Sequence, residues 1–344
     1  MIPRSALALL TAVTLVACTP AAQPLPLVPL PSPTPAAPIS FPRDASPHDA
    51  LMEWWYFTGH LSTPDGQPFG FEFVVFQVAR ANQPTGYLAH FAISDIGAQR
   101  FSHQAQFAQS PVTRTSFPLD VNGWTLDHHE GEDAITAAID DGYALQLRLD
   151  DGSKPPALHH GGYITYPPEG GSYYYSRTRL SATGTLTSPD GGARQISGVA
   201  WMDHQWGNFV ITARGGWDWY SLQLDDNTEL MLYVMRDASG ATTAVYGSHV
   251  GADGQVSDLP PGSVLSEPTG RWTSPHTGAE YPSGWLLTLP DGRRLVLTPQ
   301  LQDQELYFPG TPGAPLAYWE GAVTITGDTS GVGYVELTGY ANGQ

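Results

Sequence analysis

Three Pro-Asp-Gly tripeptides, at residues 64–66, 189–191 and 290–292, each separate two runs of residues that favour β-strands. Proline fixes φ at the first corner of a tight turn and glycine accepts a positive φ, so each tripeptide predicts a hairpin tip. The run 69–78 is rich in aromatic and β-branched residues, and 143–149 alternates between apolar and polar residues. Helical periodicity is missing beyond the N-terminus. The chain is therefore predicted to be all-β, built from antiparallel hairpins.

An internal repeat predicts two similar units. Trp55 and Trp219, each followed by a tyrosine, open two hairpins of similar layout. A strand that begins with the same Trp-Tyr pair at two distant places in the chain is typical of a duplicated unit. Closing a sheet into a barrel removes its exposed edges, so we expect two tandem antiparallel β-barrels, at residues 43–212 and 213–344. Two β-sandwiches are the alternative.

The N-terminus has the pattern of a lipoprotein signal peptide over residues 1–18. It carries a positive charge at Arg4, an apolar run at 6–16, and small residues before Cys18. Cys18 is the only cysteine in the chain, and lipidation explains its position; a plain secretory signal is the alternative. Residues 19–42 contain nine prolines and no charged residue, which predicts a semi-rigid linker. We expect an extracytoplasmic lipoprotein anchored to the membrane through Cys18.

Charge and composition exclude several classes of function. The chain has 15 Lys and Arg against 33 Asp and Glu, a formal net charge of −18. Nucleic acids and anionic membrane surfaces are bound by clustered basic residues, so they are poor partners for this chain. A single cysteine also excludes an internal disulfide and a metal site built on clustered thiolates.

Five motifs follow one another along the folded part of the chain. They cover residues 53–61, 89–95, 198–207, 217–224 and 318–340, the last in two pieces, 318–321 and 333–340. Together they resemble the family of AttH and the carotenoid 1,2-hydratases (CrtC-like proteins). The resemblance implies two tandem lipocalin-like β-barrels. It also implies kinship with hydratases that add water to acyclic carotenoid ends and with fungal cyclases that fold polyenes.

The third motif reads Gly-Val-Ala-Trp-Met-Asp-His-Gln-Trp-Gly over residues 198–207. In the hydratases of the family a His-x-Trp pair belongs to the active site, and the resemblance carries this role over to His204 and Trp206. The same enzymes use a tyrosine and an aspartate on the following strand. The tyrosine corresponds to Tyr233, whereas Asp237 lies further along than the family pattern requires, so this chain departs from the hydratases there.

Strand alternation assigns roles within this motif. Asp203 should lie on one face of the strand, and His204 and Trp206 on the other. Hydration of an isoprenoid double bond needs a general acid, aromatic faces for a cation and an apolar cavity. We assign His204 as proton donor or water-positioning group and Trp206 as the aromatic wall, with Asp203 bracing the junction between domains. The alternative is that all three form a buried structural network of hydrogen bonds.

Further candidate residues lie on other predicted strands. Glu72 is embedded in an aromatic run, where a buried, neutral glutamic acid could donate a proton. A glutamate that faces water is the alternative. His90, Tyr56, Phe76 and Tyr233 are expected to contact the ligand.

No cofactor and no metal ion is predicted from the sequence. Histidines occur as the neighbours His128-His129 and His159-His160, which would point to opposite faces of a strand. The chain contains no His-Glu-x-x-His pair, no Gly-x-Ser-x-Gly nucleophile motif and no glycine-rich nucleotide-binding motif. A hydrolase triad and a dinucleotide site are therefore not expected.

The sequence as a whole predicts a lipid-anchored, extracytoplasmic, lipocalin-like protein that binds an extended apolar ligand, an isoprenoid or another lipid. The alternative is an acid-catalysed hydratase or cyclase that acts on a polyene. A surface lipoprotein with a purely scaffolding role is the third interpretation. The expected partners are the apolar small molecule, the membrane at Cys18 and an ABC-type export system, with no nucleic acid.

Overall fold

The computed structural model describes residues 37–80, 82–152, 154–166, 170–209, 215–309 and 317–341. The predicted signal peptide with Cys18 and most of the predicted linker lie outside the described residues, so their roles stay predictions. In the described part of the chain, no helix has the length and hydrophobicity needed to span a membrane. A single turn of 3-10 helix, η1 (Arg43–Ala45), precedes the first strand.

The first sheet is antiparallel, with the strand order β4-β3-β2-β1-β11-β10-β8-β7-β6-β5 and with β9 paired to β10. Its strands are β1 (Met52–Ser62), β2 (Pro68–Val78), β3 (Thr85–Asp95), β4 (Arg100–Ser110), β5 (Leu119–Val121), β6 (Trp124–His129), β7 (Glu132–Ala138), β8 (Ala144–Asp150), β9 (Ala157–Tyr166), β10 (Gly170–Thr187) and β11 (Ala193–Phe209).

The second sheet has the order β15-β14-β13-β12-β23-β22-β20-β19-β16, with β21 paired to β22, and β17 and β18 form a separate ribbon. Its strands are β12 (Trp217–Leu224), β13 (Glu229–Arg236), β14 (Thr242–Val250), β15 (Val256–Asp258), β16 (Leu265–Pro268), β17 (Arg271–Thr273), β18 (Glu280–Pro282), β19 (Trp285–Thr288), β20 (Arg294–Pro299), β21 (Glu305–Tyr307), β22 (Ala317–Gly327) and β23 (Gly331–Leu337).

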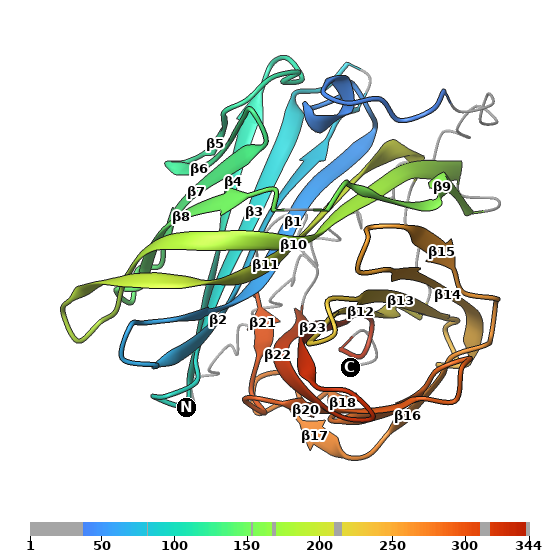
Figure 1. Cartoon of the computed structure of the whole chain (residues 1–344). Helices are drawn as coiled ribbons and strands as arrows, with labels where there is room; N and C mark the ends of the chain where they lie inside the picture. Colours follow the sequence, from blue (N-terminus) through green and yellow to red (C-terminus); the bar gives the residue numbers. More distant parts are fainter. Residues whose placement is uncertain are drawn as a thin grey trace, which may run out of the picture.

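The all-β prediction is confirmed, and both sheets curl into barrel-like shapes (Figure 1). All three Pro-Asp-Gly tripeptides form hairpin tips, in which Gly66, Gly191 and Gly292 have φ of 86°, 106° and 88°. Such angles favour glycine because they bring a Cβ atom close to the backbone. The predicted boundary at 212–216 lies largely outside the described residues; the first sheet ends at Phe209 and the second begins at Trp217.

The two sheets share one layout, because in each the first strand lies between the second strand and the last. The two Trp-Tyr dipeptides, however, face opposite ways in their strands. Trp55 belongs to the core of the first barrel, whereas Trp219 faces the other sheet and Tyr220 belongs to the core of the second barrel. A shift of one residue moves a side chain to the opposite face of a strand, and the dipeptides alone do not define it.

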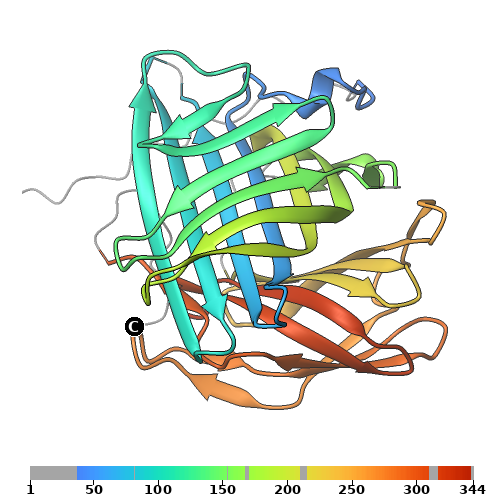
Figure 2. The same cartoon turned by 60° about the vertical axis from the view of Figure 1, so that its left-hand side comes forward.

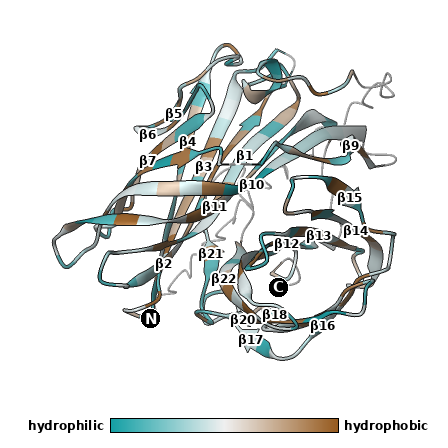
Figure 3. Cartoon of the chain, in the orientation of Figure 1, coloured by the Kyte–Doolittle hydropathy of each residue, from teal (hydrophilic) through white to brown (hydrophobic). Residues whose placement is uncertain are grey.

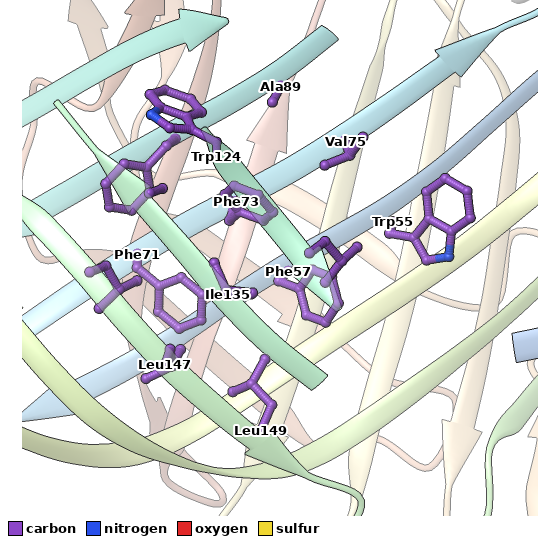
Figure 4. Close-up of a cluster of buried hydrophobic side chains, with 14 of the residues drawn as sticks. Trp55, Phe57, Phe71, Phe73, Val75, Ala89, Trp124, Ile135, Leu147 and Leu149 are labelled. Carbon is purple, nitrogen blue, oxygen red and sulfur yellow. The ribbon is translucent and has the colours of Figure 1, made fainter. Parts of the chain in front are cut away.

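Large apolar side chains pack in the interior of the first barrel (Figure 4). They come from strands that are far apart in the sequence, and those labelled in the figure are Trp55, Phe57, Phe71, Phe73, Val75, Ala89, Trp124, Ile135, Leu147 and Leu149. A separate core fills the second barrel. Figure 3 shows hydrophobic stretches on the strands of both sheets.

The two barrels pack against each other through the outer faces of their sheets (Figure 2). Strands β1, β2 and β10 of the first sheet contact β23, β22 and β12 of the second. A third apolar cluster fills this junction and includes Tyr56, Tyr174, Trp201, Trp219 and Tyr334. The central strands β1 and β11 are therefore buried on both faces, one against the barrel interior and one against the second sheet.

Candidate active site

A cavity of about 600 Å³ lies at the junction of the two sheets. The first sheet contributes outward side chains of β1 and its neighbours, and the second sheet contributes side chains of β12, β13, β22 and β23. Aromatic and apolar residues dominate the wall, among them Trp54, Tyr56, Phe76, Leu88, Tyr174, Trp217, Trp219, Tyr233 and Tyr318. Ligand sites for small apolar molecules have this size and this kind of lining.

Asp203 lines this cavity from β11 and is held by three hydrogen bonds. The indole nitrogen of Trp201 donates to Oδ1 at 2.6 Å, and the hydroxyl of Tyr174 donates to Oδ2 at 2.6 Å. Ser176 also donates to Oδ1. Burial raises the pKa of Asp203 to about 6, because desolvation outweighs these donors. Since both oxygens already accept hydrogen bonds, Asp203 is suited to fixing Tyr174 in place.

Glu336 lines the cavity from β23, on the second sheet. The indole nitrogen of Trp217 donates to its Oε2 at 2.8 Å, whereas Oε1 has no hydrogen-bond partner among the described residues. Burial in the wall raises the pKa of Glu336 to about 7, and the nearby Asp203 adds to this shift. A carboxylic acid with a pKa near neutrality, one unused oxygen and aromatic neighbours can donate a proton to a bound ligand.

Glu72 and His90 lie behind the cavity wall and do not line it. Both are fully buried, and they meet at Tyr318, which does line the cavity. The hydroxyl of Tyr318 lies 2.8 Å from Nδ1 of His90 and 3.4 Å from Oε1 of Glu72. Burial raises the pKa of Glu72 well above its ordinary value and lowers that of His90 to about 3. Glu72 is thus a buried, neutral acid, and it faces the second sheet instead of water.

The other ligand-contact candidates reach the cavity. Tyr56 lines it from β1, Phe76 from β2 and Tyr233 from β13. The ring of Tyr56 packs edge-on against Trp219, with 5.2 Å between the ring centres. The ring of Tyr233 stacks on Trp217, with 6.0 Å between the ring centres. Aromatic faces thus come from both sheets.

His204 and Trp206 lie on the opposite face of β11, in the interior of the first barrel. Nε2 of His204 is 2.7 Å from Oε1 of Glu53, and Nδ1 is 3.1 Å from the hydroxyl of Tyr175. Burial lowers the pKa of His204. Neither His204 nor Trp206 lines the cavity, which lies on the Asp203 face of β11, so their predicted contact with a ligand stays a prediction. Both faces of β11 are buried, and strand alternation separates the residues without showing which face meets a ligand.

One group of described residues has the composition of a metal site. His48, Glu53 and His204 bring three ligand atoms within 4.8 Å of one another. The sequence did not predict this group, because its members come from the segment before β1, from β1 and from β11.

A comparison of the sequence with protein families shows which family the chain belongs to. The sequence profile of AttH-like proteins matches residues 32–340, nearly the whole described part. The chain belongs to the AttH-like family.

Two solved structures share the fold of this AttH-like protein. A protein described as an AttH from Nitrosomonas europaea is 32% identical; the match covers 90% of this chain and 100% of that chain, with a TM-score of 0.82. Kievitone hydratase from Nectria haematococca is 17% identical, over 91% of this chain and 98% of that chain, with a TM-score of 0.70. A search of curated proteins gives no match. The resemblance to the AttH family is thus confirmed, while the closer resemblance to carotenoid hydratases stays a prediction.

Glu336 and Trp217 of this AttH-like chain were not predicted from the sequence as site residues. Both stand in motifs that carried the family resemblance, but neither has a special residue pattern around it. The sequence does contain one indication of Glu336. It is a single acid among apolar and aromatic neighbours in Gly-Tyr-Val-Glu-Leu, and the same kind of surroundings pointed to Glu72.

Proposed function

We propose that this AttH-like protein binds an extended, apolar, unsaturated small molecule in the cavity between the two sheets and catalyses the acid-assisted addition of water to a double bond, or a related ring closure. The observation that carries this proposal is Glu336, whose pKa is about 7 and which stands in the aromatic wall of the cavity. An isoprenoid fits the apolar character of such a site.

The reaction needs three steps from this chain's residues. Glu336 donates its proton to the less substituted carbon, so that the π electrons of the alkene form a carbon–hydrogen bond and the neighbouring carbon becomes a cation. The aromatic faces of Trp217, Trp219 and Tyr233 stabilise the carbon cation that results. A water molecule then adds its oxygen to the cation, and its surplus proton returns to the carboxylate of Glu336. The products contain all atoms of the alkene and of one water molecule, and the acid is regenerated.

Two further observations support this reaction class. The cavity is mostly apolar, so a cation formed in it meets aromatic rings before bulk water. The protein from Nectria haematococca that has the same fold is named a hydratase, and water addition is therefore a chemistry that this fold hosts in another protein. The fold alone does not transfer that substrate to this chain.

The second candidate function is binding of the same apolar molecule without turnover, as in a lipid carrier. The predicted lipoprotein signal with Cys18 favours it, because an anchored protein outside the cytoplasm is well placed to hand a lipid to a membrane or to an ABC-type export system. Both functions use the same cavity. They differ in whether Glu336 transfers a proton.

Mass spectrometry of apolar compounds that co-purify with the protein tests the site. Val78→Trp should lose bound compounds because Val78 lines the cavity and the indole would fill it. Val296→Trp is the matched control, because Val296 is exposed on β20. Equal amounts of bound compound in both variants, or none in the wild type, would overturn the proposal. A compound that binds but is never converted to a product would exclude catalysis and support the carrier function.

A further inference from the structure

A cluster of two histidines and a glutamate stands where the chain enters the first barrel. His48 lies in the segment before β1, Glu53 is near the start of β1, and His204 is on the neighbouring strand β11. Oε1 of Glu53 lies 2.7 Å from Nδ1 of His48 and 2.7 Å from Nε2 of His204. Glu53 and His204 are fully buried, while the side chain of His48 is 21% exposed. The cluster is thus reachable from one side only.

Each member of this cluster is oriented by a second residue. The other ring nitrogen of His48 lies 3.3 Å from Oδ1 of Asp44, and that of His204 lies 3.1 Å from the hydroxyl of Tyr175. Oε2 of Glu53 accepts from the backbone N–H of His48 at 2.8 Å and from Gln77 at 3.2 Å. Protein metal ligands are held in this manner, with histidines bonded through the second nitrogen and carboxylates through the second oxygen.

The surroundings of His48 argue for an ion. Its two ring nitrogens face Glu53 and Asp44, and both carboxylates accept hydrogen bonds. A neutral imidazole has one N–H, so it can serve only one of them. A metal ion on Nδ1 removes this conflict, because Nε2 then keeps its hydrogen for Asp44. The alternative without metal is that hydrogen bonds alone hold the cluster together.

We propose that Nδ1 of His48, Nε2 of His204 and Oε1 of Glu53 bind a divalent transition-metal ion, with Zn²⁺ as the best match to two imidazoles and one carboxylate. A tetrahedral Zn²⁺ with bonds of about 2.1 Å holds its ligand atoms about 3.4 Å apart, so each imidazole has to move about 0.7 Å away from Oε1. Water occupies the fourth position, on the exposed side of His48.

The metal site is separate from the cavity of the proposed reaction. Glu53 and His204 point into the first barrel, whereas the cavity lies on the outer face of β1 and β11. The ion would join the segment before β1 to both central strands. An ion that binds the folded chain but not the unfolded chain stabilises the folded state, so the melting temperature should rise with metal concentration.

Titration of the metal-free protein with Co²⁺ tests this inference, because tetrahedral Co²⁺ absorbs visible light strongly. We expect one ion per chain, displaced by Zn²⁺, and a rise in melting temperature. His48→Ala should weaken binding about 100-fold or more, and Asp44→Asn about 10-fold, because Asp44 orients the ring of His48 through Nε2. His48 is partly exposed, so its variant should fold, which circular dichroism checks. His276→Ala, at a surface histidine beside Asp303, is the control and should bind Co²⁺ as the wild type does.

Two results would overturn the inference. One is the lack of saturable Co²⁺ binding by the folded wild type, which would leave hydrogen bonding alone as the explanation of the cluster. The other is equal Co²⁺ affinity in His48→Ala and wild type, which would place the ion elsewhere. Neither result bears on Glu336, so the proposed function is tested independently.

Discussion

The indole N–H of Trp217 donates a 2.8 Å hydrogen bond to Oε2 of Glu336, from strand β12 to its neighbour β23. This bond fixes one oxygen of the carboxyl group in the cavity wall. The other oxygen is left for a ligand or water in the cavity. A half-buried acid held in this way, with a pKa of about 7, is partly protonated at neutral pH and presents its proton in one direction, as a general acid requires.

Replacement of this acid should separate binding from chemistry. Glu336→Gln keeps the shape of the side chain and an oxygen that accepts from Trp217, but it has no acidic proton. We expect turnover to fall about 10²- to 10⁴-fold, the usual contribution of a general acid, while ligand affinity is kept. Glu267→Gln, at an exposed glutamate of β16, is the control. Unchanged turnover in Glu336→Gln would exclude the proposed role.

Turnover should depend on pH through the same group. Burial raises the pKa of Glu336 from 4.5 to about 7, and the protonated form is the active one. The rate constant at saturating ligand should therefore be constant below this pKa and fall about tenfold per pH unit above it. The reason is that the fraction of protonated Glu336 falls about tenfold with each pH unit above the pKa. A rate that rises with pH through neutrality would identify a general base instead.

Much of the fold follows from sequence because its signals are local. The turn tripeptides define hairpin tips through the backbone demands of proline and glycine, and alternation along residues 143–149 defines the faces of β8. The cavity depends on the packing of one sheet against another. That packing buries Tyr56 as well as Trp55, so apolar and polar residues do not alternate there, and the sequence does not show which side of β1 is the interior of a barrel.

The 198–207 motif shows that prediction from sequence has the same limit for the candidate active site. Alternation separates Asp203 from His204, and the structure places them on opposite faces of β11. The partners of each residue come from distant segments: Tyr174 of β10 holds Asp203, and Glu53 of β1 holds His204. Sequence spacing carries no information on such contacts. For this reason the cluster with His48 was not predicted at all.

Asp203 should matter for stability through its hydrogen bonds. Asp203→Ala would leave the buried donors of Trp201, Tyr174 and Ser176 without their acceptor, at a cost of about 3 kcal/mol in the free energy of unfolding. Chemical denaturation followed by fluorescence measures this loss. Asp190→Ala, in the exposed turn at 189–191, should change stability by less than about 0.5 kcal/mol. Equal stability of the two variants would mean that the network around Asp203 contributes little.

The proposed membrane anchor rests on a single residue. Cys18→Ser should abolish labelling with radioactive palmitate and should release the protein from the membrane fraction, because Cys18 is the only cysteine available. The folded part should keep its melting temperature, since the substitution lies outside both sheets. Persistent labelling, or unchanged membrane association, would contradict a lipid anchor at this position.

Water addition at the Glu336 cavity is the central step of the proposed function, and incubation in heavy-oxygen water measures it directly. Lycopene and the apolar compounds extracted from the protein serve as substrates, and mass spectrometry follows the products. We expect the wild type to yield a product heavier by one molecule of heavy-oxygen water, and Glu336→Gln to yield almost none. Product without the heavy oxygen, or equal product from both proteins, would contradict the account.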